Sequence, residues 1–292
     1  MTRDSVLALS ATGPDAPSFR VRVLGLADQL ASDGVDLRPA PLLTVEEAHT
    51  FARAGLRDRA RIALNARARL REAIDESSDQ TTLISREVDL TPSLTIERLA
   101  ARGRRVIYDV DDAIWFSWKR EAGGHPLAFL KRSASKARWL AETARAVIAG
   151  NEILAHWLRA YSKRVHVVPS VVETRTRAIR KHEDSDELVA GWIGSPSTAA
   201  SLRLAADPLG RLARRLPGKR VRLLVVGGPA LAVPGVTVEA RAWSPKAEVL
   251  ALSEIDVGLM PWTTTPGLAA NAPIRPSSTW GPVFRSLRTT SA

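Results

Sequence analysis

Short apolar runs alternate along the chain with longer stretches in which apolar residues recur at helical spacing. A buried strand needs only about four to eight apolar residues, whereas an amphipathic helix repeats its apolar residues about every 3.6 positions. Strands that alternate with helices in this way predict a parallel α/β architecture. The apolar runs predict strands at 6–9, 82–84, 106–108, 147–149, 165–168, 188–193, 221–226, 236–240 and 257–260. The periodic stretches predict helices at 19–30, 57–71, 129–144, 152–161, 199–214 and 245–253.

A charge-dense segment at 174–187 separates two groups of predicted strands. Polar segments of this kind connect domains, so we expect one parallel-sheet domain at 1–173 and a second at 188–262. Beyond residue 262 the chain contains no Asp or Glu, no helical period and no strand run, which predicts an irregular tail over 263–292.

Composition narrows the class of protein. The 292 residues include no Cys, which excludes disulfides, thiolate metal sites and a cysteine nucleophile. The N-terminal apolar run is too short for a signal peptide, and no stretch approaches the roughly 18 apolar residues of a membrane-spanning helix. We therefore expect a cytoplasmic protein.

The net charge of +11 does not by itself indicate nucleic-acid binding, because the arginines are spread along the whole chain. The richest stretch, 57–71, has helical spacing and is more typical of a solvated helix face. A diffuse positive field still attracts phosphorylated metabolites or acidic lipid surfaces.

Three loops follow predicted strands, at the sheet edge where parallel α/β proteins bind ligands. The first contains Ser18, Arg20 and Arg22. Residues two apart cannot share one helix face, so at least one of these arginines is expected to point into the crevice. The alternative is the start of a surface helix.

The second loop places three carboxylates, Asp109, Asp111 and Asp112, at the end of an apolar strand. Mutual repulsion is expected to raise the pKa of at least one, which suits a base or a hydroxyl acceptor. The alternative is a helix-capping Asp with solvated neighbours. Metal binding is disfavoured because the nearest His in sequence is His125.

The third loop, Gly194-Ser195-Pro196-Ser197-Thr198, joins a strand to a predicted helix. Free N–H groups and hydroxyls at a helix start form a ready phosphate site, although many α/β loops look alike. The chain lacks both G-x-G-x-x-G and G-x-x-x-x-G-K-[ST], which argues against a dinucleotide oxidoreductase or a P-loop NTPase.

Together these segments resemble bacterial glycosyltransferases of the family-4 kind (group 1), which have the GT-B fold of two Rossmann-like parallel-sheet domains facing a cleft. The matching segments are PSFRVRVLGLADQL, ISREVD, VIYDVDDAIWF, ARAVIAGNEILAHWL, VHVVPSVVE, LVAGWIGSPST, VRLLVVGG and SEIDVGLMPW. The resemblance implies retaining transfer of a sugar from a nucleotide-diphosphate donor, with no bound metal and no other cofactor. It places the acceptor in the N-terminal domain and the donor in the C-terminal domain.

The resemblance also assigns roles residue by residue. In the N-terminal domain, Asp111 and Asp112 match the catalytic acidic position on the acceptor side, near Asp109, and Asn151 matches a residue that faces the cleft. The residues that match the loop near the donor phosphates are Ser18, Arg20 and Arg22. In the C-terminal domain, the residues that match the donor phosphate loop are Gly194, Ser195 and Thr198, and those that match the nucleobase contact are Trp243 and Ser244.

The chain departs from the family after residue 261, where an R-G-K segment and a G-x-P-V-V-A segment should follow. Reading the codons of 262–292 one nucleotide earlier permits R-G-K and, at 283–288, G-L-P-V-V-A. We interpret the tail as a frameshifted translation that leaves the second domain incomplete. The expected result is weak or absent transfer, because the cation that binds the diphosphate is lost. We also expect a tendency to aggregate, because an apolar edge and face of the last sheet lose their cover.

The resemblance suggests a cell-surface glycan or glycolipid as the acceptor, with the basic surface favouring the inner membrane face. One alternative is a non-catalytic remnant that binds a nucleotide or a partner. Binding of nucleic acid is disfavoured by the scattered arginines and by the acidic cluster.

Overall fold

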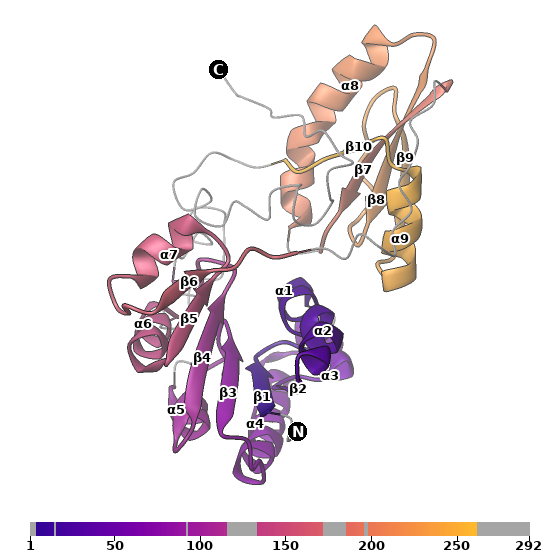
Figure 1. Ribbon diagram of the computed structural model, residues 1–292. Helices are drawn as coiled ribbons and strands as arrows, with labels where there is room; N and C mark the ends of the chain where they lie inside the picture. The colour runs from indigo at the N-terminus through magenta and orange to yellow at the C-terminus, as the bar shows by residue number, and fades with distance from the viewer. Residues whose placement is uncertain are drawn as a thin grey trace. The chain divides into compact units, whose positions relative to one another are not determined.

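The computed structural model describes residues 4–14, 16–91, 93–115, 133–171, 185–195 and 198–261. They form two compact α/β units, an N-terminal unit that ends at Val171 and a C-terminal unit built from residues 185 onward (Figure 1). One unit contains a six-stranded sheet and the other a four-stranded sheet, and every strand pair is parallel. The predicted fold class is confirmed, and the second sheet is the smaller.

The N-terminal sheet has the strand order β2-β1-β3-β4-β5-β6. Since all its strands are parallel, their carboxyl ends lie at one edge of the sheet, where ligand sites form in this architecture. The strands are β1 (Asp4–Ser10), β2 (Val35–Pro41), β3 (Thr81–Ser85), β4 (Arg105–Val110), β5 (Ala146–Ala149) and β6 (Val165–Val167). The α-helices are α1 (Pro17–Arg22), α2 (Ala27–Ser32), α3 (Val45–Arg53), α4 (Leu56–Asp75), α5 (Thr95–Ala101), α6 (Ser133–Thr143) and α7 (Glu152–Leu158).

The two faces of this sheet bury apolar clusters of different size. The larger cluster joins the strands to α4, α5, α6 and α7 and includes Leu70, Tyr108 and Leu140. The smaller cluster contains Ala8, Phe19 and Val23 and lies under α1. Because helices cover both faces of the sheet, the central strands consist largely of consecutive apolar residues.

The C-terminal sheet has the order β10-β7-β8-β9. Figure 1 shows α8 and α9 on opposite faces of this sheet, and each face has its own apolar cluster, around Trp192 on one face and Ile255 on the other. The elements are β7 (Glu187–Ile193), β8 (Arg220–Val226), β9 (Thr237–Arg241), β10 (Val257–Gly258), α8 (Ala206–Arg215) and α9 (Pro245–Glu254).

Several predicted elements were wrong in detail. The helix at 19–30 is divided into α1, the 3-10 helix η1 (Leu24–Leu26) and α2, and Gly25 lies at the division, where glycine costs a helix about 1 kcal/mol. The helix at 199–214 begins as the 3-10 helix η4 (Ala199–Ala205). Pro208 explains the change, because its ring is tolerated in the first turn of α8 but not in a helix interior.

Two predictions lie wholly or mainly outside the described residues. These are the irregular tail at 263–292 and most of the linker at 174–187. No helix among the described residues has the length and apolar character that crossing a membrane requires.

Candidate functional site

The carboxyl edge of the six-stranded sheet holds a buried ion pair between Arg22, at the end of α1, and Asp109 on β4. Arg22 Nη2 lies 2.5 Å from Asp109 Oδ1, and each side chain is only 5% exposed. Arg22 Nε donates to Asp109 Oδ2 at 2.9 Å. Burial raises the pKa of Asp109, and the hydrogen bonds from Arg22 act in the opposite direction.

Arg22 thus points into the N-terminal unit, whereas Arg20 is half-buried on the same helix, and the expectation that one of the two arginines faces a crevice stays a prediction. The remaining donors of Arg22 are used inside the same unit: Nη1 bonds the Val168 carbonyl at 3.0 Å and Ser170 Oγ at 3.1 Å. This arginine ties α1 to β4 and to the segment after β6. Its expected contact with a donor phosphate stays a prediction.

Asp112 is held by Arg86, which follows β3. Arg86 Nη2 donates to Asp112 Oδ2 at 2.9 Å, and Nη1 reaches Ser18 Oγ at 3.4 Å. Partial burial is the main cause that raises the pKa of Asp112, while Arg86 lowers it and the charge of Asp111 adds a smaller upward shift. The expectation of a raised pKa is therefore confirmed, but burial rather than repulsion is its leading cause.

Asp111 differs from its two neighbours in lacking such a partner. Its side chain is 4% exposed. Oδ1 forms a long ion pair with Arg86, whose Nε lies 3.9 Å away. No described residue gives this buried oxygen a hydrogen bond. An unsatisfied buried polar atom costs about 1–3 kcal/mol, and more when charged, so Oδ1 is the atom of the cluster that most needs a donor.

Two further residues complete the surroundings of Asp111. A Cβ on Gly150 would lie 3.1 Å from the Asp111 Cα, so glycine here lets the loop after β4 pack closely against the end of β5. Ser85 is paired with Asp109 across the sheet, and its buried Oγ also has no hydrogen-bond partner among the described residues. Sequence reasoning missed Ser85 and Arg86, although both directly follow the predicted strand at 82–84.

Asn151, predicted to face a cleft, is the N-terminal cap of α7. Its Oδ1 accepts the Leu154 N–H at 3.0 Å and so caps α7. A capping Asn is strongly favoured at this position whatever ligand binds nearby. Contact between Asn151 and a ligand therefore stays a prediction.

In the C-terminal unit, the turn after β7 differs from the expected phosphate loop. The Ser195 N–H donates to Thr198 Oγ1 at 3.2 Å, and the N–H groups of Thr198 and Ala199 donate to the Ser195 carbonyl at 2.9 and 3.1 Å. The expectation of free N–H groups is therefore wrong for these three residues, because the turn satisfies them internally. A phosphate would have to replace these bonds.

Gly194 is explained by packing. A Cβ at this position would lie 2.3 Å from the ring of Trp192, and a Cβ on Gly227 would lie 2.1 Å from the Gly194 carbonyl oxygen. Gly227 also has a φ of +82°, a left-handed conformation that favours glycine. Both glycines lie at the carboxyl ends of their strands and allow close approach of backbone there.

Trp243 and Ser244 follow β9 at the same edge of this sheet. The Trp243 indole N–H donates to Glu248 Oε2 at 3.0 Å, which fixes the ring against α9. Ser244 Oγ accepts the Ala247 N–H at 3.0 Å and so caps α9. The contact of these residues with a nucleobase stays a prediction.

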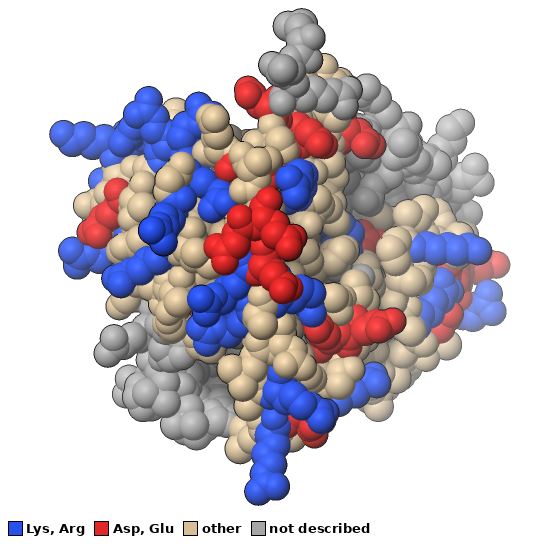
Figure 2. Space-filling model, turned by 90° about the horizontal axis from the view of Figure 1, so that it is seen from below, with Lys and Arg blue, Asp and Glu red and all other residues tan. Residues whose placement is uncertain are grey.

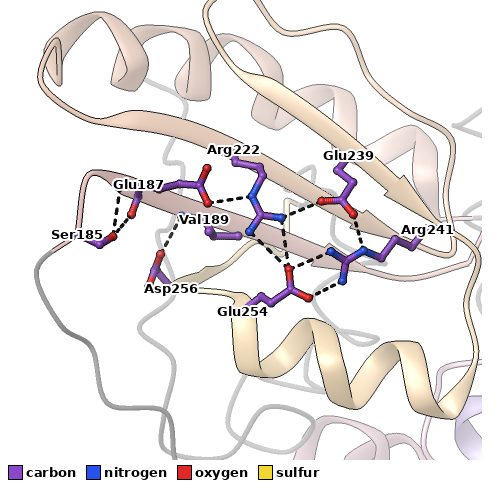
Figure 3. A network of polar contacts seen from close by, with 8 residues as sticks. All are labelled: Ser185, Glu187, Val189, Arg222, Glu239, Arg241, Glu254 and Asp256. Atoms are coloured by element: carbon purple, nitrogen blue, oxygen red, sulfur yellow. Dashed lines mark hydrogen bonds and ion pairs between the residues drawn. The ribbon is translucent and has the colours of Figure 1, made fainter.

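An ion-pair network anchors α9 to the sheet (Figure 3). Arg241 lies 2.6 Å from both Glu239 Oε1 and Glu254 Oε1, and Arg222 contacts Glu187, Glu239 and Glu254 at 3.1, 2.8 and 3.3 Å. Asp256 Oδ2 also accepts a hydrogen bond from the Val189 N–H at 2.8 Å. The network holds α9, whose first residues follow Trp243 and Ser244, and no pattern in the sequence predicts it.

Charge on the surface is mixed on the face that Figure 2 shows. Lys and Arg side chains there surround a central cluster of Asp and Glu, so the positive charge does not form one continuous patch on that face. Within the described ranges, no three His, Cys, Asp or Glu side chains gather as a metal site.

Comparison with known proteins gives a likeness of fold alone. No protein-family profile matches the sequence, and no curated protein matches it. The catalytic domain of Starch Synthase IV from Arabidopsis thaliana, bound to ADP and acarbose, is similar with a TM-score of 0.55 and 9% identity over 88% of this chain and 78% of that chain. Sucrose-phosphate synthase from Thermosynechococcus elongatus is similar with a TM-score of 0.54 and 12% identity over 90% and 77%.

A third similar structure is an alpha-glucosyltransferase in complex with UDP and a 13-mer DNA, with a TM-score of 0.54 and 11% identity over 88% of this chain and 72% of that chain. At these identities the shared property is the architecture, two parallel α/β units of the GT-B type found in glycosyltransferases. The narrower likeness to family 4 is not tested by these structures.

Proposed function

We propose that this chain transfers a glycosyl group from a nucleotide-diphosphate sugar to a hydroxyl of a glycan or glycolipid. The observation that carries the proposal is the buried Asp111 Oδ1, which has no hydrogen-bond donor among the described residues and lies at the carboxyl edge of a parallel sheet. The GT-B architecture supports it, since structures with that fold are described with bound UDP or ADP.

In this proposal the three carboxylates have different tasks. Asp109 is paired with Arg22 and Asp112 with Arg86, so these two shape the site. Asp111 accepts the hydrogen bond and then the proton of the attacking acceptor hydroxyl. The acceptor oxygen bonds to the anomeric carbon, and the bond from that carbon to the phosphate oxygen breaks, with the electron pair leaving on the nucleoside diphosphate.

The donor is assigned to the C-terminal unit, with its diphosphate at Ser195–Thr198 and its nucleobase stacked on Trp243. Binding there requires the internal bonds of the turn to open in favour of phosphate oxygens, because the N–H groups of Ser195, Thr198 and Ala199 are already used. Helix starts and fixed cations in place of a metal would stabilise the charge that develops on the leaving diphosphate. The family resemblance implies retention of the anomeric configuration, which in a single step requires the acceptor oxygen to attack from the face on which the diphosphate leaves.

The experiment that tests this function is a transfer assay with a panel of nucleotide sugars, comparing wild type with Asp111→Asn. The variant keeps the shape and removes the acceptor charge, so kcat/KM should fall by about 10²-fold or more. Asp75→Asn, the same change at an exposed position at the end of α4, is the matched control and should keep wild-type activity. Full activity of Asp111→Asn in an active protein would refute the role of Asp111.

A second candidate function is a nucleotide or partner binder without catalysis. The turn after β7 favours it over catalysis, because the N–H groups of Ser195, Thr198 and Ala199 are bonded within the turn and are not set to stabilise the charge that develops on a leaving diphosphate. Isothermal titration with UDP and GDP beside the transfer assay separates the two, because binding without turnover supports only the second.

We place the reaction in the cytoplasm at the inner membrane face, as the family resemblance implies. The proposed frameshift concerns 262–292, outside the described residues, and the nucleotide sequence of the gene tests it directly. If the alternative frame does not encode R-G-K and G-L-P-V-V-A, that interpretation fails.

A further inference from the structure

Arg86 has a backbone conformation that its side chain does not favour. Among the described residues other than glycine, it is the one with a positive φ, +62°. This left-handed region costs an L-residue about 1–2 kcal/mol, a cost that glycine avoids. An arginine kept at such a position indicates that the site uses its side chain, because strained residues of this kind gather at functional sites.

The side chain of Arg86 reaches three predicted site residues from two other segments. Its guanidinium contacts Asp112 Oδ2 at 2.9 Å, Ser18 Oγ at 3.4 Å and Asp111 Oδ1 at 3.9 Å. The left-handed turn also directs the Arg86 N–H to the Asp109 carbonyl at 2.8 Å. One residue therefore joins the segment after β3 to α1 and to the loop after β4.

We propose that Arg86 is the positioning residue of the acceptor site, which holds Asp111, Asp112 and Ser18 in the arrangement that an acceptor hydroxyl meets. This inference rests on the proposed function. The charged groups around Asp112 are Arg86 from the segment after β3, Asp111 beside it, and the pair of Arg22 from α1 with Asp109 from β4. Arg22 is hydrogen-bonded to Asp109 and also acts electrostatically on Asp111, whereas Arg86 is the cation bonded to Asp112.

Removal of this guanidinium takes away the cation that is bonded to Asp112 and lies 3.9 Å from Asp111 Oδ1. An opposite charge within about 4–6 Å lowers a carboxyl pKa by about 1–3 units, and a like charge raises it. In Arg86→Gln, Asp112 should therefore titrate at higher pH, and Asp111 should lose its fixed orientation. If Arg86 only filled space, its replacement by Gln would change neither the titration of Asp112 nor the orientation of Asp111.

The first experiment follows transfer kinetics against pH in Arg86→Gln and Arg86→Lys. We expect Arg86→Gln to lower kcat by about 10²-fold, as for loss of a positioned acid–base group. The acidic limb of its pH profile should move upward by about 1 unit, because the proposed base Asp111 loses the cation that lies 3.9 Å from its Oδ1. Arg86→Lys keeps the positive charge. Its acidic limb should therefore lie where that of wild type lies, whereas its kcat should be between those of wild type and Arg86→Gln. Arg71→Gln, at an exposed position on α4, is the matched control.

The second experiment does not depend on activity. Carboxyl carbons of the folded protein are titrated by NMR, and the Asp112 signal is assigned with Asp112→Asn. The Asp112 midpoint should rise by about 1 pH unit in Arg86→Gln. If Arg86→Gln does not fold, Arg86→Gly removes the same guanidinium while relieving the left-handed backbone, and the same rise is expected.

The two experiments separate the inference from the proposed function. An unchanged Asp112 midpoint, or an unchanged pH profile in an active protein, overturns the role of Arg86 whether or not the chain transfers sugar. A raised midpoint in a protein that transfers no sugar refutes the proposed function while supporting the contact between Arg86 and Asp112. A raised midpoint together with the displaced pH profile supports both.

Discussion

At the scale of single residues, the acidic cluster is defined by how its carboxylates are paired. Asp109 and Asp112 each have an arginine within 2.9 Å, whereas Asp111 has none closer than 3.9 Å in the recorded ion pairs. A carboxylate already paired with a guanidinium has less capacity to accept a substrate proton. The pairing therefore distinguishes Asp111 from two residues of the same type in the same segment.

The buried pair of Arg22 and Asp109 makes a prediction about stability. Arg22→Met leaves Asp109 buried without its cation, so the free energy of unfolding should fall by about 3–5 kcal/mol, measured by urea denaturation. The double variant Arg22→Met with Asp109→Leu removes the orphaned charge and should recover much of the loss. A single variant as stable as wild type would show that the pair is not required.

The sequence predicted several residues of this site, but neither Ser85 nor Arg86, and it did not predict how the residues pair. Ser18, Arg22 and the three aspartates were found because each follows a predicted strand at the carboxyl edge. Their pairing depends on contacts between residues far apart in the chain, 87 positions for Arg22 with Asp109 and 26 for Arg86 with Asp112. No local pattern encodes such distances, and a left-handed arginine has no sequence signature.

At the scale of elements, apolar runs predicted buried strands well and edge strands poorly. β4 and β8 are buried on both faces, and the predicted runs at 106–108 and 221–226 lie inside them. β2 lies at the edge of its sheet, contains Pro39 and Pro41, and exposes much of its surface, so it has no apolar run to detect. Proline is tolerated in edge strands because one side of such a strand needs no ladder bonds.

The helix α9 depends on electrostatics more than on its own pattern. Glu254 lies at its carboxyl end, where a negative charge opposes the helix dipole, and Arg241 and Arg222 compensate for it. Hydrogen bonds from Arg241 are the main cause that lowers the pKa of both Glu239 and Glu254 below the ordinary 4.5. The ionised glutamates therefore stabilise the folded unit.

This pairing predicts a dependence of stability on acid. Because the folded-state pKa values are depressed, the stabilisation is complete above about pH 4.5 and is lost as the pH falls through the lower folded values. Arg241→Gln should destabilise the C-terminal unit at pH 7 and reduce its further loss on acidification, measured by hydrogen exchange of β8 and α9 amides. Arg211→Gln, in the exposed pair with Asp207 on α8, is the control and should change stability by less than about 0.5 kcal/mol. Equal acid sensitivity in Arg241→Gln and wild type would contradict the argument.

At the scale of the whole molecule, the alternation of strands and helices was enough to predict two parallel sheets. The order of strands within each sheet was not predictable, because it depends on which apolar faces pack across the chain. β1 illustrates this, since it pairs with β2 on one side and with β3 on the other, and β3 begins about seventy residues later in the sequence. Each unit nevertheless brings its candidate residues to one sheet edge, as parallel topology requires.

The division into two units leads to a prediction about where the nucleotide binds. If the C-terminal unit takes the donor, UDP should slow hydrogen exchange at 194–198 and 243–247 and leave the acidic cluster of the N-terminal unit unchanged. Trp243→Ala should weaken UDP binding about tenfold, because base–aromatic stacking contributes about 1–3 kcal/mol. Trp243→Phe retains a stacking face and loses only the indole bond to Glu248, so it should bind within about threefold of wild type if stacking dominates. Protection confined to residues 109–112, or equal UDP affinity in wild type and Trp243→Ala, would place the nucleotide elsewhere and remove the basis for assigning the donor to this unit.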